Sequence, residues 1–123
     1  MVLHINHAQE IDPAVALSIK KMHQAGILML NQSVLLKGVN NSARAQIELQ
    51  ETLGSLRVQP YYLHMLDPVA GAKHFEVSMQ EAQNIIKSLH AHLPGYLVPK
   101  LVREEPGMPA KTPVFRPDWH SDI

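Results

Sequence analysis

Polar side chains follow each of four apolar segments in this chain, and their types could do chemistry. Because the apolar segments alternate with helical patterns, we expect them to be parallel strands whose carboxyl ends meet at one rim. The catalytic residues of α/β barrels lie at that rim, so this pattern favours an enzyme. The polar groups are His4, Asn6 and His7, then Asn31 and Gln32, then His64 and Asp67, and finally Arg103, Glu104 and Glu105.

The chain has eight histidines, and imidazole is both a metal ligand and a general base. A histidine-metal hydrolase would need His4, His7 and His64 to converge on one ion. A spacing of three on a strand does not place His4 and His7 on the same face. His90 and His92 lie at an expected helix end, where imidazolium favours the helix dipole. We interpret most histidines as caps or surface groups and expect only His4 to point into a barrel.

Lys111 lies in a segment rich in proline and glycine, residues 106–113. It could be a solvated loop lysine. It could also be held on a restricted loop to form an imine with an aldehyde cofactor. Composition does not decide between these alternatives.

The elements that must position these residues follow from the periodicity of the apolar side chains. Alternation predicts a first strand over residues 2–6, and Asp12-Pro13 predicts a helix start, with Gly26 beyond the helix end. A continuous apolar run predicts a second strand over residues 27–30, covered on both faces. The remaining expected elements are a helix over 42–53, a strand over 60–66, a helix that begins with a Ser78–Glu81 capping box, and a strand that starts at 96–98.

This order predicts an α/β fold, a partial (β/α) barrel with about four parallel strands and three helices. A complete barrel needs about 250 residues, so we expect a piece of a larger barrel. Residues 1–103 would hold the βα units, and residues 104–123 a loop and tail. Unpaired strand edges predict that the chain pairs with another copy of itself.

Composition excludes several classes of function. Acidic and basic side chains balance at 11 each, so nothing indicates binding to nucleic acid or to an anionic membrane. There is no signal peptide and no apolar run of about 20 residues, which predicts a cytoplasmic protein. There is no cysteine, which excludes disulfides and thiolate-held metal centres within these residues.

Longer blocks carry a family resemblance. They are His4-Ile5-Asn6-His7, the segment NQSVLLKGVN at 31–40, the segment PYYLHMLD at 60–67, and Lys111-Thr112-Pro113. Together with matching residues between them, these blocks resemble the C-terminal part of the lysine 2,3-aminomutases. The resemblance covers nearly the whole chain. It is closest to the short bacterial branch that makes β-lysine for modification of elongation factor P.

The resemblance implies a radical S-adenosylmethionine barrel that uses a [4Fe–4S] cluster and pyridoxal phosphate to move an amino group between carbons 2 and 3 of L-lysine. Lys111 matches the lysine that holds pyridoxal phosphate. Asp67 matches a carboxylate that recognises the far ammonium of lysine, and Glu104 falls where related enzymes have an aspartate with the same role. Gln32 and His4 match positions that line the S-adenosylmethionine and cofactor pocket.

The three-cysteine cluster motif of the family is missing, because the chain has no cysteine. We therefore expect an expressed fragment or a truncated gene product that cannot turn over lysine by itself. The alternative is a non-catalytic interaction module that kept the fold after losing the cluster-binding half.

Overall fold

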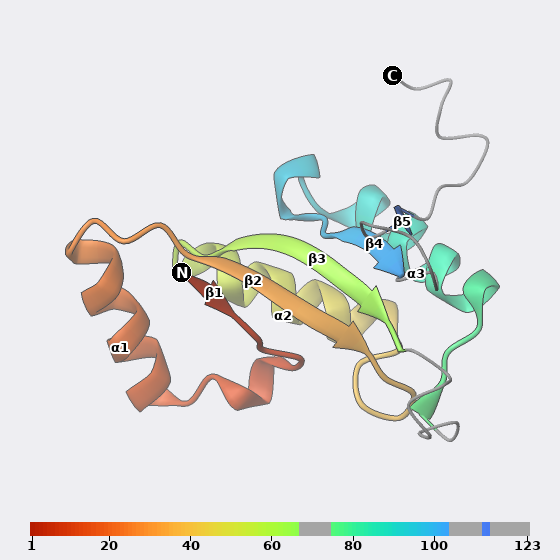
Figure 1. The fold of residues 1–123 in the computed structure, drawn as a ribbon, viewed down its shortest axis with the longest axis horizontal. Coiled ribbons are helices and arrows are strands. Elements are labelled where there is room, and N and C mark those ends of the chain that lie inside the picture. Colours follow the sequence, from red (N-terminus) through yellow and green to blue (C-terminus); the bar gives the residue numbers. More distant parts are fainter. Residues whose placement is uncertain (67–74, 104–111, 114–123) are drawn as a thin grey trace.

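A single sheet organises the computed structural model, which describes residues 1–66, 75–103 and 112–113 (Figure 1). Its strands lie in the order β1-β2-β3-β4-β5; the first four are parallel, and β5 is antiparallel to β4. This confirms the prediction of an α/β fold with four parallel strands and three helices. The elements are β1 (Val2–Leu3), η1 (Ala8–Glu10), α1 (Pro13–Gln24), β2 (Leu30–Leu35), α2 (Ala43–Ser55), β3 (Gln59–Met65), α3 (Met79–His92), η4 (Gly95–Leu97), β4 (Lys100–Arg103) and β5 (Thr112–Pro113).

Each long helix begins at a side-chain cap. Asp12, Ser42 and Ser78 each accept a hydrogen bond from the backbone N–H three residues later, at 2.8 to 3.1 Å. Such caps satisfy N–H groups that the first turn of a helix leaves without partners. The capping box expected at Ser78 is only half formed, because the Glu81 carboxylate accepts a hydrogen bond from the Asn41 amide instead.

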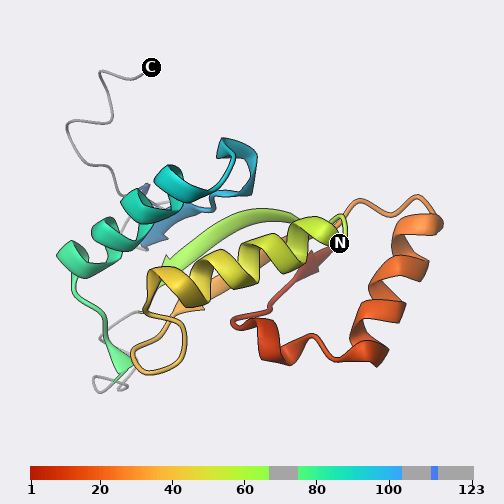
Figure 2. The ribbon, with the colours of Figure 1, turned by 180° about the vertical axis from the view of Figure 1, so that it is seen from behind.

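The helices cover one face of the sheet, and the core lies between them and the strands. Helices α2 and α3 both lie behind the sheet in Figure 1 and in front of it in Figure 2, which is the view from the other side. One cluster centres on α3 and consists of Leu35, Leu63, Val77, Ala82, Ile85, Ile86, Leu89, Leu93 and Leu101. A second joins α1 and α2 and consists of Ile19, Met29, Leu49, Leu53 and Val58. Helices α1 and α3 therefore each turn one apolar face toward the core.

The second strand was predicted too early. The prediction placed it at residues 27–30, buried on both faces, but Ile27 and Leu28 are 37% and 73% exposed. The strand is β2, Leu30–Leu35, and it pairs with β3 over most of its length. Asn31 and Gln32 therefore lie in the first half of the strand and not at its carboxyl end.

The first strand is shorter than the predicted 2–6, because a side chain replaces its backbone partner. Beyond Leu3, the Asn31 amide accepts from the Ile5 N–H at 2.9 Å and donates to the Ile5 carbonyl at 3.0 Å. The fourth strand begins at Lys100, four residues later than predicted. Pro99 has no N–H for the ladder, so pairing starts after it.

Two further details differ from the sequence prediction. Helix α2 continues through Gly54 to Ser55, and β5 was not anticipated at all. The helices α1, α2 and α3 have 12, 13 and 14 residues. Within the described ranges, none is long and apolar enough to cross a bilayer.

Candidate functional site

The sheet face opposite the helices carries the polar side chains of the central strands. In a strand, successive side chains point to opposite faces. Leu35 of β2 and Leu63 of β3 belong to the helix-side core, so Gln32 and His64 face the other side. This face is the one turned toward the viewer in Figure 1. A polar, half-buried strand face of this kind can hold a ligand without disturbing the core.

Gln32 and His64 form a hydrogen-bonded pair on this face. The two atoms, His64 Nε2 and Gln32 Oε1, are 3.1 Å apart, and both side chains are half-buried. The bond fixes the carboxamide of Gln32, because the imidazole donates to its oxygen. No residue in the described ranges accepts a hydrogen bond from the Gln32 amide nitrogen. The pair therefore presents an oriented N–H donor to the open face of the sheet.

Tyr62 extends this polar surface along β3. Its ring lies edge-on to the imidazole of His64, with ring centres 5.7 Å apart. Its hydroxyl also contacts that of Tyr61 at 3.2 Å. Tyrosine combines an apolar ring with a polar tip, so this neighbourhood suits a ligand with both characters.

Of the predicted site residues, the structure describes His4 and Gln32. His4 is exposed and lies just beyond β1. Gln32 is hydrogen-bonded to His64 on the open face of the sheet, and this bond does not involve His4. Asp67, Glu104 and Lys111 lie outside the described residues, so their positions remain predictions.

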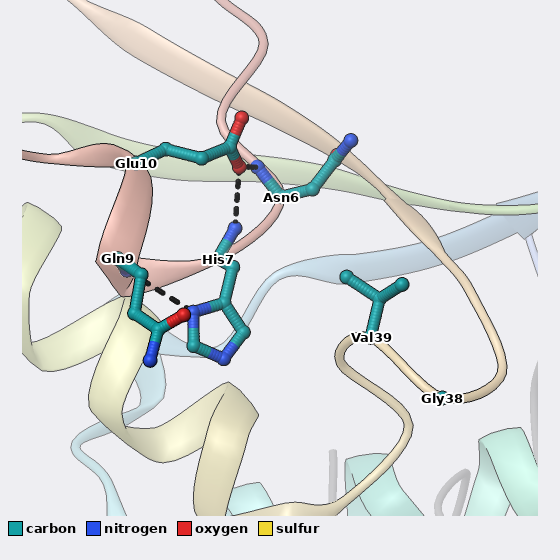
Figure 3. A pocket seen from close by; sticks show the side chains of 6 residues that line it. All are labelled: Asn6, His7, Gln9, Glu10, Gly38 and Val39. Atoms are coloured by element: carbon teal, nitrogen blue, oxygen red, sulfur yellow. Dashed lines mark hydrogen bonds between the residues drawn. The ribbon is translucent and has the colours of Figure 1, made fainter.

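A hollow of about 530 Å³ lies at the carboxyl ends of β1 and β2, with the His7 ring and Val39 on opposite sides (Figure 3). A capping box shapes it. The Glu10 carboxylate accepts from the backbone N–H groups of Asn6 and His7 at 2.6 and 2.7 Å, and His7 Nδ1 accepts from the Gln9 N–H at 3.0 Å. Glu10 was not among the predicted site residues, although a glutamate three residues after a cap is a recognisable signal.

The structure does not group His4, His7 and His64, which the metal-hydrolase alternative requires. His7 uses Nδ1 as a cap, and His64 is bonded to Gln32. Among the described residues, which include His4, His7 and His64, no three histidine, aspartate or glutamate side chains are grouped to hold an ion. The cap interpretation of His92 agrees with the structure, because its Nδ1 lies 2.8 Å from the Ser88 carbonyl in the last turns of α3.

Amide side chains hold the segments after β1 and β2 in place. Asn40 is 1% exposed and donates to the carbonyls of Asn6 and Val34 at 2.8 and 2.9 Å, while its oxygen accepts from Leu36 N–H at 2.8 Å. Gln46, fully buried on α2, donates to the Asn40 carbonyl at 3.0 Å. The two strand ends are therefore fixed to each other and to α2 by side chains, which gives the polar rim a defined shape.

Parallel strands that alternate with helices on one face of the sheet are the arrangement of α/β-barrel enzymes. Comparison with known proteins gives a narrower assignment, although no protein-family model matches the chain. The chain is 48% identical over 114 residues to L-lysine 2,3-aminomutase of Escherichia coli K12, and 50% identical over 112 residues to that of Haemophilus influenzae. It is 39% identical over 112 residues to the protein of the same name from Clostridium subterminale.

These matches cover 93%, 91% and 91% of this chain and fall in the C-terminal part of each relative. Over about nine-tenths of its own length, the chain is therefore similar to the C-terminal part of proteins named L-lysine 2,3-aminomutase. It spans about a third of the length of these curated relatives: 33% of the E. coli and H. influenzae proteins and 27% of the clostridial one.

Proposed function

We propose that this chain forms the part of an L-lysine 2,3-aminomutase that holds lysine and pyridoxal phosphate. The whole enzyme would convert L-α-lysine to β-lysine by radical migration of an amino group between carbons 2 and 3. The observation that supports this is the similarity, over about nine-tenths of the chain, to relatives named L-lysine 2,3-aminomutase.

Residue roles follow from the resemblance. Lys111 would hold pyridoxal phosphate, and Asp67 and Glu104 would flank the far ammonium of lysine, because a desolvated ammonium needs carboxylate partners. Gln32 and His4 would line the pocket for S-adenosylmethionine and pyridoxal phosphate. For Gln32 the geometry is favourable, since its amide nitrogen is an oriented donor with no acceptor among the described residues.

The cluster does not fit this chain, because cluster iron is held by thiolates and the sequence contains no cysteine. When bound in the whole enzyme, the [4Fe–4S] cluster with S-adenosylmethionine would supply the radical, and pyridoxal phosphate would carry the migrating amino group. A cysteine-bearing polypeptide must therefore complete the enzyme. The 123-residue chain alone is expected to produce no β-lysine from L-lysine, and β-lysine detected by chromatography would contradict this.

Two observations favour the branch that serves elongation factor P. Identity is 47% to 50% with the E. coli, Buchnera and Haemophilus relatives, against 38% to 39% with the clostridial and fusobacterial ones. The more similar relatives are also the shorter ones, since the chain makes up a larger share of them. The direct test is to ask whether an enzyme completed with this chain gives β-lysine-modified elongation factor P.

The lysine assignment can be tested on the chain itself. Pyridoxal phosphate is added, the mixture is reduced with borohydride, and the labelled lysine is found by peptide mapping. We expect the label on Lys111. Lys111→Arg should remove that label, whereas Lys100→Arg, at an exposed position on β4, should leave it unchanged. Label spread over many lysines, or unaffected by Lys111→Arg, would contradict the preformed site.

A further inference from the structure

The turn that follows β1 is closed by hydrogen bonds that end on two titratable side chains. His7 is the cap of η1, and its Nδ1 accepts from the Gln9 N–H at 3.0 Å. The Glu10 carboxylate accepts from the N–H groups of Asn6 and His7 at 2.6 and 2.7 Å. The usual cap residues, serine, threonine, aspartate and asparagine, keep an acceptor oxygen near neutral pH. An imidazole cap is different, because it titrates between about pH 5 and 8.

The direction of the Gln9 bond fixes the protonation of the His7 ring. A backbone N–H can only donate, so Nδ1 must carry a lone pair and the neutral ring must carry its proton on Nε2. A protonated ring has an N–H at both nitrogens, and two donors would then face each other. The cap therefore forms only while His7 is neutral. The opened turn binds one proton more than the capped turn, so acid favours opening.

Other titratable groups near the ring do not account for a change between about pH 5 and 8. In the part of the chain that the structure describes, the hollow beside the ring is lined by one further titratable side chain, Glu10, and glutamate ordinarily titrates near about pH 4. His4 lines a separate groove toward α1. The loop after β2 contributes Gly38 and Val39 to the hollow. The charged residues of α2 line another hollow, which they share with His92 of α3, and are Arg44, Glu48 and Glu51.

The residues before His7 are held by carboxamides and should stay in place when the cap opens. Both peptide groups of Ile5 are bonded to the Asn31 side chain. The Asn6 carbonyl accepts from the Asn40 amide at 2.8 Å, and the Asn6 side chain accepts from the Val34 N–H at 2.9 Å. Carboxamides do not titrate in this range. Opening is therefore confined to residues 7–10, which form one wall of the hollow.

We infer that His7 is a pH-sensitive latch on this rim. The neutral ring closes the turn at residues 7–10, and the protonated ring releases it, which opens the hollow of about 530 Å³ on the side opposite Val39 (Figure 3). The inference is independent of the proposed reaction, because it needs only the bonds of the described residues.

The test is the exchange of backbone amides with solvent, measured by NMR on the 123-residue chain. Rates are expressed as protection factors, which removes the intrinsic dependence of exchange on pH. From about pH 8 to about pH 5, the protection of the Gln9 N–H should fall about fivefold, as the loss of one typical hydrogen bond gives, with the midpoint of the His7 ring titration. The Ile5 N–H should keep its protection. Constant protection of Gln9 through the His7 titration would overturn the inference.

Two substitutions identify the sensor. His7→Asn keeps an acceptor at the cap but cannot titrate, so the response of Gln9 to pH should disappear. His23→Asn is the matched control, because it makes the same change at an exposed position on α1 and should leave the response as in the parent chain. A response that persists in His7→Asn would overturn the inference, since another group would then be the sensor.

The carboxylate is tested separately. Glu10→Gln keeps an acceptor oxygen for the Asn6 and His7 N–H groups and removes the charge, so the response should remain. Loss of the response in this variant would assign it to Glu10 and refute the role of His7.

A further readout needs no variant and so does not depend on how a variant folds. The ¹⁵N resonances of an imidazole distinguish a protonated ring nitrogen from an unprotonated one. In the parent chain at about pH 8, His7 should carry its proton on Nε2, with Nδ1 unprotonated. A proton on Nδ1 at that pH would show that the cap does not form, and the inference would fall.

Discussion

Replacing Asn40 with alanine would remove three hydrogen bonds from the segments after β1 and β2. The Asn40 side chain accepts from Leu36 N–H and donates to the carbonyls of Asn6 and Val34, all at 2.8 to 2.9 Å. All three partners are backbone groups in part-buried contacts. Alanine cannot replace any of these bonds, so the perturbation leaves one donor and two acceptors without their partner.

The expected loss of stability follows from these groups. A buried polar group left without a partner costs about 1–3 kcal/mol. Because the three groups are only part-buried, water can reach some of them, and we take the lower end, about 3 kcal/mol in total. For 123 residues, about 1 kcal/mol corresponds to about 4 °C in Tm, so we expect Tm to fall by about 12 °C.

The assay is urea unfolding followed by circular dichroism, with the slope m checked for constancy. Asn41→Ala is the matched control, since this neighbouring amide bonds only Gly38 N–H and the Glu81 carboxylate at a more exposed position. It should cost about 1 kcal/mol. Asn40→Asp keeps the acceptor, loses both donated bonds and should cost at least as much as alanine. A loss at Asn40→Ala no larger than at Asn41→Ala would refute the reasoning.

Three further predictions concern packing and caps. Gly54→Ala should gain less than the about 1 kcal/mol that alanine usually gains over glycine in a helix, because the new Cβ would lie 2.7 Å from Leu97 Cδ2 and the leucine side chain must shift. A double-mutant cycle with Leu97→Ala should recover the full gain, and a full gain in the single variant would contradict the contact. Leu89→Ala, at a fully buried position, should cost about 2–5 kcal/mol in urea unfolding, whereas Leu17→Ala, at a position 53% exposed, should cost less than about 0.5 kcal/mol. Asp12→Ala should cost about 1 kcal/mol of stability, because it removes the side-chain cap of α1, whereas Asp12→Asn should cost almost nothing. If thermal melts show equal costs for the two variants, the cap is not the cause.

The helices could be predicted from the sequence because their signals are local. Caps at Asp12, Ser42 and Ser78 and apolar residues at helical spacing each depend on a few neighbouring positions. The second strand could not be placed in the same way. Its helix-side positions include Asn31 and Ser33, both buried, so the inward face is polar in two places and the usual alternation is lost. The run at residues 27–30 is more apolar than the strand itself, although it includes the exposed Leu28. The prediction therefore placed the strand in this run.

The candidate site was only partly predictable for a related reason. Gln32 was named from the sequence, but its partnership with His64 depends on the register of β2 against β3, which includes an irregularity between Asn31 and Ser33. Register is a property of two strands together and is not visible in either one. The preference for His4 as an inward-facing residue likewise assumed a first strand longer than the one that forms.

The segments after β1 and β2 are joined by carboxamides, which neither gain nor lose protons across the physiological range. Asn31, Asn40 and Gln46 connect neutral groups, so their bonds carry no net charge for salt to screen. The bonds of these three carboxamides should therefore be the same in acid and alkaline buffer and at low and high ionic strength. The capping box after β1 is different, because there the Glu10 carboxylate and the His7 imidazole accept the backbone hydrogen bonds, and both groups can be protonated. A change in the shape of this rim with pH would then arise at residues 6–10 and not at the carboxamides.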